Sequence, residues 1–248
     1  MSYDNLLYLN DSYIKEFDAE VISVMDGKFV VLDKTAFYPN AGGQLHDTGT
    51  LVTDDGREFE VVFVAKIKDD VSHEVKPKDS SYDMLKTGDK VHGSIDWERR
   101  YKLMRSHTAA HVVSGVISQE LGAKIHGNQK TMEKIRIDFD TEHFDKDYLK
   151  DLVDKSNRIM AGENPVKTYF VEKSDMEEDP SMMKLAKGLP DSVQEVRIVE
   201  ITGFDKQPCG GTHVKNLSEI GDIEFLKAEN RGKNNRRLYF KLKDDREG

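Results

Sequence analysis

The stretch ERRYKLMRSHTAAHVVSGVISQEL, residues 98–121, contains no proline and has the periodicity of a helix. Its apolar residues recur at three- and four-residue spacing, as Val112, Val113, Val116, Ile117 and Leu121 show. The pattern before this stretch is that of strands, and the pattern after it mixes helices with strands. We therefore predict that a long helix opens a second domain, with residues 1–95 forming the first domain and residues 96–248 the second.

Residues 19–95 consist of short apolar alternations separated by turn signals. The pairs Asp26-Gly27 and Asp55-Gly56 each lie between runs rich in Val and Phe. This arrangement is typical of hairpins with type I′ turns, in which both central residues have positive φ. The first domain is therefore predicted to be a small antiparallel β-barrel or a curled meander.

Beyond residue 121 the pattern predicts a strand at 134–140, an acidic helix at 143–162 and a strand at 165–173. A polar segment with methionines follows at 176–187, and further strands are expected at 193–201, 220–228 and 236–242. The irregular alternation and the consecutive final strands favour an α+β domain, with helices packed on one face of an antiparallel or mixed sheet.

Composition excludes several classes of protein. The 248 residues carry a formal net charge of −9, which argues against a general nucleic-acid coat and requires a local basic patch for any RNA contact. Cys209 is the single cysteine, so no intramolecular disulfide forms. We expect no secretory leader, because no charged segment followed by an apolar one stands at Met1. No apolar run approaches the roughly 18 residues of a membrane helix. We expect a cytoplasmic protein without a membrane role.

Two histidines four residues apart, His107 and His111, project from the side of the helix opposite its apolar arc. Such pairs are often surface or core residues. The segment QPCGGTHV, however, repeats the spacing with Cys209 and His213, and glycines between them let the chain curl. Imidazole and thiolate are ligands that zinc prefers. The pattern predicts a Zn²⁺ site, either structural with four protein ligands or catalytic with three ligands and water.

Three motifs, RSHTAAH, CGGTHV and TAFYPNAGGQLHDTGTL, together resemble the editing module of alanyl-tRNA synthetases. The size and content of the chain are more similar to the free-standing AlaX proteins. The stretches GNQ at 127–129, RIDFD at 136–140, IGDIEF and RRLYF fall in the expected order, so the resemblance covers nearly the whole chain. The editing domain of threonyl-tRNA synthetases shares the two ligand pairs, but the Gly-rich motif favours the alanine system.

The resemblance implies a hydrolase that removes serine or glycine from mischarged tRNA(Ala), with Zn²⁺ held by His107, His111, Cys209 and His213. A pocket shaped for the alanine side chain rejects serine and glycine poorly, because an added hydroxyl or a missing methylene changes binding by only about 1–3 kcal/mol. A second selection, by an editing site, is therefore needed. Polar groups that grip the serine hydroxyl would reject alanine, since alanine leaves them unpaired. We expect Thr108 or Gln129 to supply this group, although a helix-surface Thr and a loop Gln are equally ordinary. His126 stands where relatives are expected to carry a small hydroxyl residue.

Two further groups of residues are predicted to contact tRNA. Gly42 and Gly43 would bring backbone amides to the terminal adenosine or phosphate, with Gln44 as a polar contact, although this motif can also be an ordinary turn. Basic residues cluster before His107 and near the C-terminal strands, where phosphate contacts are expected. These candidates are Arg99, Arg100, Arg105, Arg236 and Arg237.

Two other functions fit the sequence. One is a zinc-stabilised module that binds tRNA or a synthetase without chemistry, and the other is an editing hydrolase for a threonine-system tRNA. No long coiled coil is present, so a monomer is the default expectation.

Overall fold

The computed structural model describes residues 3–68, 70–142, 144–178 and 193–243. The chain divides into two compact units, the first made of residues 1–104 with 130–132 and the second of residues 105–129 with 133–248. The sequence predicted two domains with a boundary between residues 95 and 96. Compact units are not by themselves independently folding domains, so this boundary stays a prediction.

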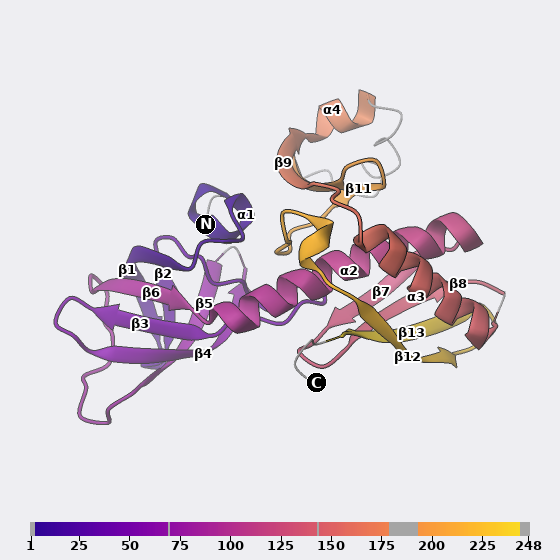
Figure 1. Cartoon of the computed structure of the whole chain (residues 1–248). Helices are drawn as coiled ribbons and strands as arrows, with labels where there is room; N and C mark the ends of the chain where they lie inside the picture. The colour runs from indigo at the N-terminus through magenta and orange to yellow at the C-terminus, as the bar shows by residue number, and fades with distance from the viewer. Residues whose placement is uncertain (1–2, 69, 143, 179–192, 244–248) are drawn as a thin grey trace. The chain divides into compact units, whose positions relative to one another are not determined.

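The first unit is built around a closed antiparallel barrel, as the sequence predicted (Figure 1). Its strands follow the order β1-β2-β5-β4-β3-β6, and pairing of β1 with β6 closes the sheet. Buried and exposed residues alternate along β1, since successive side chains point to opposite faces of a strand. A short 3-10 helix (η1) and one helical turn (α1) precede the barrel. The bounds are η1 Tyr3–Asn5, α1 Leu7–Asn10, β1 Glu16–Met25, β2 Phe29–Leu32, β3 Gly49–Thr53, β4 Glu58–Ile67, β5 Asp70–Pro77 and β6 Lys90–Ile95.

The two predicted hairpin turns differ. Asp26 and Gly27 have φ values of 50° and 68°, which confirms the type I′ turn between β1 and β2. At the second turn only Gly56, with φ of 86°, is left-handed, so the type I′ prediction is wrong there. Thr53 pairs with Arg57 through a backbone hydrogen bond of 3.0 Å, leaving a three-residue loop that needs one left-handed residue at its end.

The long helix α2, Trp97–Leu121, is confirmed. The arc predicted to be apolar is buried from Val112 to Ile117, whereas Leu121 at the end of the helix is half-buried. Gly122 follows the helix with φ of 62°, a left-handed conformation that commonly ends helices.

The second unit holds two sheets and helix α3, Lys146–Met160. The four-stranded sheet has the order β12-β13-β8-β7, and the three-stranded sheet has the order β11-β10-β9. Pairing is antiparallel within β12-β13-β8 and throughout β9-β10-β11. The bounds are β7 Ile125–Lys130, β8 Ile135–Asp140, β9 Val166–Glu172, α4 Lys173–Glu178, β10 Glu195–Ile201, β11 Asp205–Pro208, η2 Leu217–Glu219, β12 Ile223–Asn230 and β13 Asn235–Leu242.

Helix α3 is amphipathic and packs against β12, which agrees with the predicted α+β class (Figure 1). Its N-cap Asp145 accepts hydrogen bonds from the amides of Asp147 and Tyr148, and Leu149, Val153 and Met160 are among the side chains it buries. Strand β7 contains the stretch GNQ, which corrects the expectation of a loop there. The polar segment predicted at 176–187 lies outside the described residues beyond Glu178.

None of the described helices is long and apolar enough to cross a membrane.

Candidate metal centre

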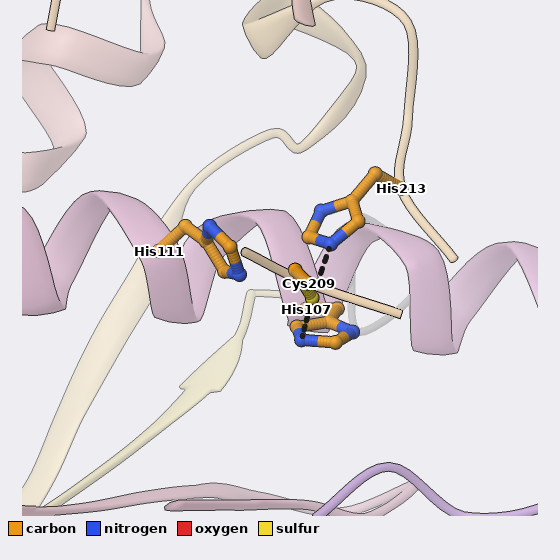
Figure 2. A group of neighbouring side chains, drawn as sticks. All are labelled: His107, His111, Cys209 and His213. Carbon is orange, nitrogen blue, oxygen red and sulfur yellow. Dashed lines mark hydrogen bonds between the residues drawn. The ribbon is translucent and has the colours of Figure 1, made fainter. Parts of the chain in front are cut away.

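Helix α2 carries His107 and His111 one turn apart on the same side, with ring centroids separated by 5.2 Å. Both side chains are almost fully buried. They face the segment between β11 and η2, which carries Cys209 and His213 (Figure 2). The structure therefore brings together the two pairs that the sequence places about one hundred residues apart.

The four side chains offer donor atoms that all lie within 4.8 Å of one another. The Sγ of Cys209 lies 3.5 Å from Nε2 of His107 and 3.3 Å from Nε2 of His213 (Figure 2). The rings of His111 and His213 are also adjacent, with centroids 4.6 Å apart. Three imidazoles and one thiolate at this spacing could hold a metal ion, and this donor set fits zinc chemically.

The loop that carries Cys209 is fixed by a buried arginine that the sequence interpretation missed. Nη1 of Arg197, on β10, donates to the carbonyls of Cys209 and Gly211 at 2.7 and 3.0 Å. Neither Gly210 nor Gly211 is left-handed, so the curl does not require positive φ. The amide of Gly211 instead approaches Sγ of Cys209 at 3.4 Å.

Each of two histidines has a polar partner on the nitrogen that points away from the cysteine. Nδ1 of His213 lies 3.1 Å from the hydroxyl of Thr108, which also accepts a hydrogen bond from the amide of Val214. Nδ1 of His111 lies 3.0 Å from the amide nitrogen of Gln207 and 3.6 Å from a carboxylate oxygen of Asp205.

The environment of His111 favours its charged form. Burial by itself lowers the pKa of His111, but the interactions with Asp205 and Cys209 outweigh this effect and raise the pKa to about 9. Asp205 and Gln207 were not singled out from the sequence. Their signal is their position four and two residues before Cys209, because alternate residues of one strand share a face.

The two candidates for reading a serine hydroxyl lie in different environments. Thr108 is fully buried, so its interpretation as a helix-surface residue is wrong, and its hydroxyl contacts His213. Gln129 is exposed on β7. His126, on the same strand, is exposed as well. The functional roles of these residues stay predictions.

The Gly-rich segment forms a turn in which Gly42 and Gly43 have φ values of 55° and 73°. Lys130, which is almost fully buried, donates from Nζ to the carbonyl of Gly42 at 2.8 Å. Its backbone amide donates to the carbonyl of Gly43 at 2.6 Å. Gln44 is fully buried, so its side chain has no surface with which to contact tRNA, which corrects that prediction.

Two of the five arginines predicted to contact tRNA are buried, and these assignments are corrected. The guanidinium of Arg100 is fully buried in an ion pair with Asp47 and also donates to the carbonyls of Ser12 and Ala36. Asp47 in turn accepts a hydrogen bond from the amide of Tyr38, so it orders the Gly-rich loop. Arg236 is also buried, and its guanidinium donates to carbonyls of its own hairpin and of residue 142.

The other three arginines keep partial exposure. The Nε atoms of Arg99 and Arg105 donate to the carbonyls of His46 and Ile220, both at 2.9 Å. Arg237 forms a two-point ion pair with Asp138 on the neighbouring strand. Phosphate contact by these three residues stays a prediction.

Comparison with known proteins identifies the relatives of this chain. Residues 7–99 match the family model of class II (A) tRNA synthetases, and residues 196–239 match the second additional domain of threonyl and alanyl tRNA synthetases. The alanyl-tRNA editing protein AlaX-M of Methanosarcina acetivorans is 49% identical over 242 residues, which covers 96% of this chain and 99% of that protein. The chain belongs to the AlaX-M family of alanyl-tRNA editing proteins.

Other AlaX-M proteins are similar over the same extent. The AlaX-M protein of Saccharolobus solfataricus is 42% identical over 237 residues, which covers 96% of this chain and 98% of that protein. Alanine–tRNA ligase of Saccharolobus islandicus is 36% identical over 228 residues, which is 90% of this AlaX-M chain but 25% of the ligase. The relationship to alanyl-tRNA synthetases expected from the motifs is confirmed.

Proposed function

We propose that this protein edits mischarged tRNA(Ala) in trans, by hydrolysing the ester bond that joins serine or glycine to the tRNA. The names of the similar AlaX-M proteins support an alanyl-tRNA editing role. The observation that carries the chemistry is the convergence of His107, His111, Cys209 and His213 on one centre.

We assign Zn²⁺ as the ion of this centre. Nitrogen and sulfur donors suit zinc better than the oxygen-preferring Mg²⁺ or Ca²⁺. Bound zinc supplies a Lewis acid that polarises a carbonyl and activates or orients water. The chain itself contributes the fixed ligand geometry, since Arg197 holds the cysteine loop and Thr108 contacts the ring of His213.

Selection against alanine requires a polar group that only serine satisfies. We propose the exposed amide of Gln129 for this contact, because an amide can both donate to and accept from a hydroxyl. The hydroxyl of Thr108 has internal partners, which favours a role through His213. Replacing Gln129 by Ala should therefore abolish discrimination between serine and alanine without loss of the fold.

For the tRNA itself we propose contacts from the Gly42–Gly43 turn and from the partly exposed Arg99, Arg105 and Arg237. Both glycines are exposed, and they have no side chains of their own to cover their backbone amides. We further propose that the protein is cytoplasmic and monomeric. Sedimentation equilibrium of the purified protein would check the monomeric state.

The experiment is deacylation of tRNA(Ala) charged separately with serine, glycine and alanine. Wild-type protein, protein treated with a zinc chelator and Cys209→Ala are compared, with circular dichroism to verify folding. We expect release of serine or glycine while alanine is spared, and loss of this activity both with the chelator and in Cys209→Ala.

Other outcomes separate the alternatives. A folded, zinc-loaded protein that binds tRNA(Ala) but hydrolyses none of the three esters would favour a binding module. Hydrolysis of seryl esters on a threonine-system tRNA, but not on tRNA(Ala), would move the function to that system.

A further inference from the structure

Strand β11 places a carboxylate and an amide behind His111. Asp205 and Gln207 are alternate residues of β11, and the amide nitrogen of Gln207 donates to Oδ2 of Asp205 at 2.7 Å. Both groups approach Nδ1 of His111, at 3.6 Å for the carboxylate and 3.0 Å for the amide nitrogen. Nδ1 therefore faces β11, and Nε2 is left as the nitrogen that can bind an ion.

Phe204, which directly precedes β11, closely approaches Gly115 of α2. A Cβ atom on Gly115 would lie 2.7 Å from the Phe204 ring. Gly115 is one helical turn beyond His111, and Phe204 is the chain neighbour of Asp205, which approaches that histidine. The missing side chain at position 115 thus lets β11 come close to the helix.

Metal binding through Nε2 requires a hydrogen on Nδ1, because a neutral imidazole carries one proton. At His213 this requirement is met, since the hydroxyl of Thr108 has two lone pairs and can accept from Nδ1 as well as from Val214. At His111 the nearer group is the amide nitrogen of Gln207, which donates only to an Nδ1 without a hydrogen, so it must turn from Nδ1 when the ion binds and cannot accept a hydrogen bond. The carboxylate of Asp205 can.

We propose that Asp205 is a positioning residue that accepts the Nδ1 hydrogen of His111 and so fixes the ring for metal binding, with Gln207 steadying the carboxylate. The inference rests on the zinc site assigned under the proposed function. Oδ2 of Asp205 lies 3.6 Å from Nδ1 of His111. A movement of the carboxylate by about 1 Å brings these two atoms to the distance of a charge-assisted hydrogen bond. A carboxylate behind a ligating histidine orients the ring and strengthens it as a ligand.

The first test measures transfer of zinc from the protein to a chromogenic chelator, for wild type, Asp205→Asn and Asp154→Asn. Asp154 is exposed on α3, so its substitution makes the same charge change away from the metal centre. We expect Asp205→Asn to bind zinc about 10- to 100-fold more weakly, whereas Asp154→Asn matches wild type. Equal affinity in Asp205→Asn and wild type would overturn the proposal.

The second test observes the hydrogen bond itself by NMR of zinc-loaded protein with ¹⁵N-labelled histidine. In wild type, His111 should carry a hydrogen on Nδ1 that exchanges slowly with water, and Asp205→Asn should speed this exchange. A His111 ring protonated on Nε2, or with fast-exchanging Nδ1–H, contradicts the inference even where the variant fails to fold. Wild-type protein that retains no zinc would instead refute the zinc assignment on which the inference depends.

Discussion

At the scale of single residues, the buried ion pair between Arg100 and Asp47 stabilises the first unit and has no exposed part. Replacing Arg100 by Met leaves the carboxylate of Asp47 buried without its partner. We expect Arg100→Met to lower the free energy of unfolding by about 3–5 kcal/mol in urea titrations. Arg158→Met, at an exposed position of α3, is the control and should change stability by less than about 0.5 kcal/mol.

A double variant separates this cost from lost packing. Arg100→Met combined with Asp47→Leu removes both charges, so it should be more stable than Arg100→Met alone. A double variant that is less stable than the single one would mean that the hydrogen bonds to Ser12 and Ala36, and not the ion pair, carry the stability.

His73 gives the barrel a predictable response to pH. It is fully buried between the hydroxyl of Thr35 and the carbonyl of Val30, and burial lowers its pKa from 6.5 to about 4 although the contact with Val30 opposes the shift. The unfolded chain therefore binds a proton more readily than the folded one between these values. The contribution of His73 to the free energy of unfolding is complete above pH 6.5. It falls as pH decreases toward 4, by about 3 kcal/mol at most.

The measurement is the free energy of unfolding at several pH values, together with NMR titration of the His73 ring. A ring that titrates near 6.5 in the folded protein would contradict the expected pH dependence.

Thr108 is expected to support metal binding through His213. Thr108→Val keeps the shape of the side chain but removes the acceptor for Nδ1 of His213. Zinc affinity should fall by about 10-fold or more, measured by competition with a chelator. Thr108→Ser retains the hydroxyl and should bind zinc nearly as wild type does. Equal loss in both variants would point to packing of the threonine methyl group instead.

At this scale the sequence predicted which residue types converge but not what surrounds them. His107, His111, Cys209 and His213 could be paired because helical spacing and a Gly-rich turn are local features. Arg100 and Arg236 were mistaken for surface cations because charge along a sequence says nothing about burial in an ion pair or a hairpin. The same limit hid Asp205, which approaches His111 only in the folded chain.

At the scale of elements, the contact of Gly115 with Phe204 links α2 to the segment that enters β11. Gly115→Ala forces the phenyl ring to move, which shifts the neighbouring Asp205. Because alanine favours the helix by about 1 kcal/mol, we expect little net change in stability but a faster loss of zinc. Gln119→Ala, exposed on the same helix, is the control for helix propensity and should retain zinc as wild type does. Unchanged zinc release in Gly115→Ala would show that the contact does not position β11.

Elements with a clear period were predictable and short polar ones were not. The helix α2 and the hairpin β1-β2 were found because apolar spacing and the Asp26-Gly27 turn agree with each other. Strands β7 and β11 were missed, since IHGNQK and DKQP lack an apolar face and are strands only because neighbouring strands pair with them.

At the scale of the whole molecule, a net charge of −9 must coexist with binding of a polyanion. We expect tRNA binding to weaken steeply as salt rises, with a slope set by the few arginines that reach phosphates. Arg99→Ala, Arg105→Ala and Arg237→Ala should each weaken binding and reduce the salt slope by about 1, measured by filter binding. Arg158→Ala removes the same charge elsewhere and should leave the slope unchanged. A flat salt response in wild type would contradict phosphate contacts by these residues.

The broad architecture was predictable because composition, turn signals and period agree on a β-rich first part and an α+β second part. Closure of the barrel was suggested by the pattern but depends on β5, which lies between β2 and β4 and carries mixed charges. The motifs contributed what periodicity could not, namely the relationship to alanyl-tRNA editing proteins.

The distance along the chain between the ligand pairs also governs biosynthesis. His107 and Cys209 are 102 residues apart, so a ribosome must translate most of the second unit, but not its last two strands, before the ion can be captured by both pairs. Closing so long a loop is slow, and nascent chains that stop before Cys209 have only a histidine pair to offer. Metal retention by nascent chains stalled at different lengths should therefore begin only when His213 has left the ribosome.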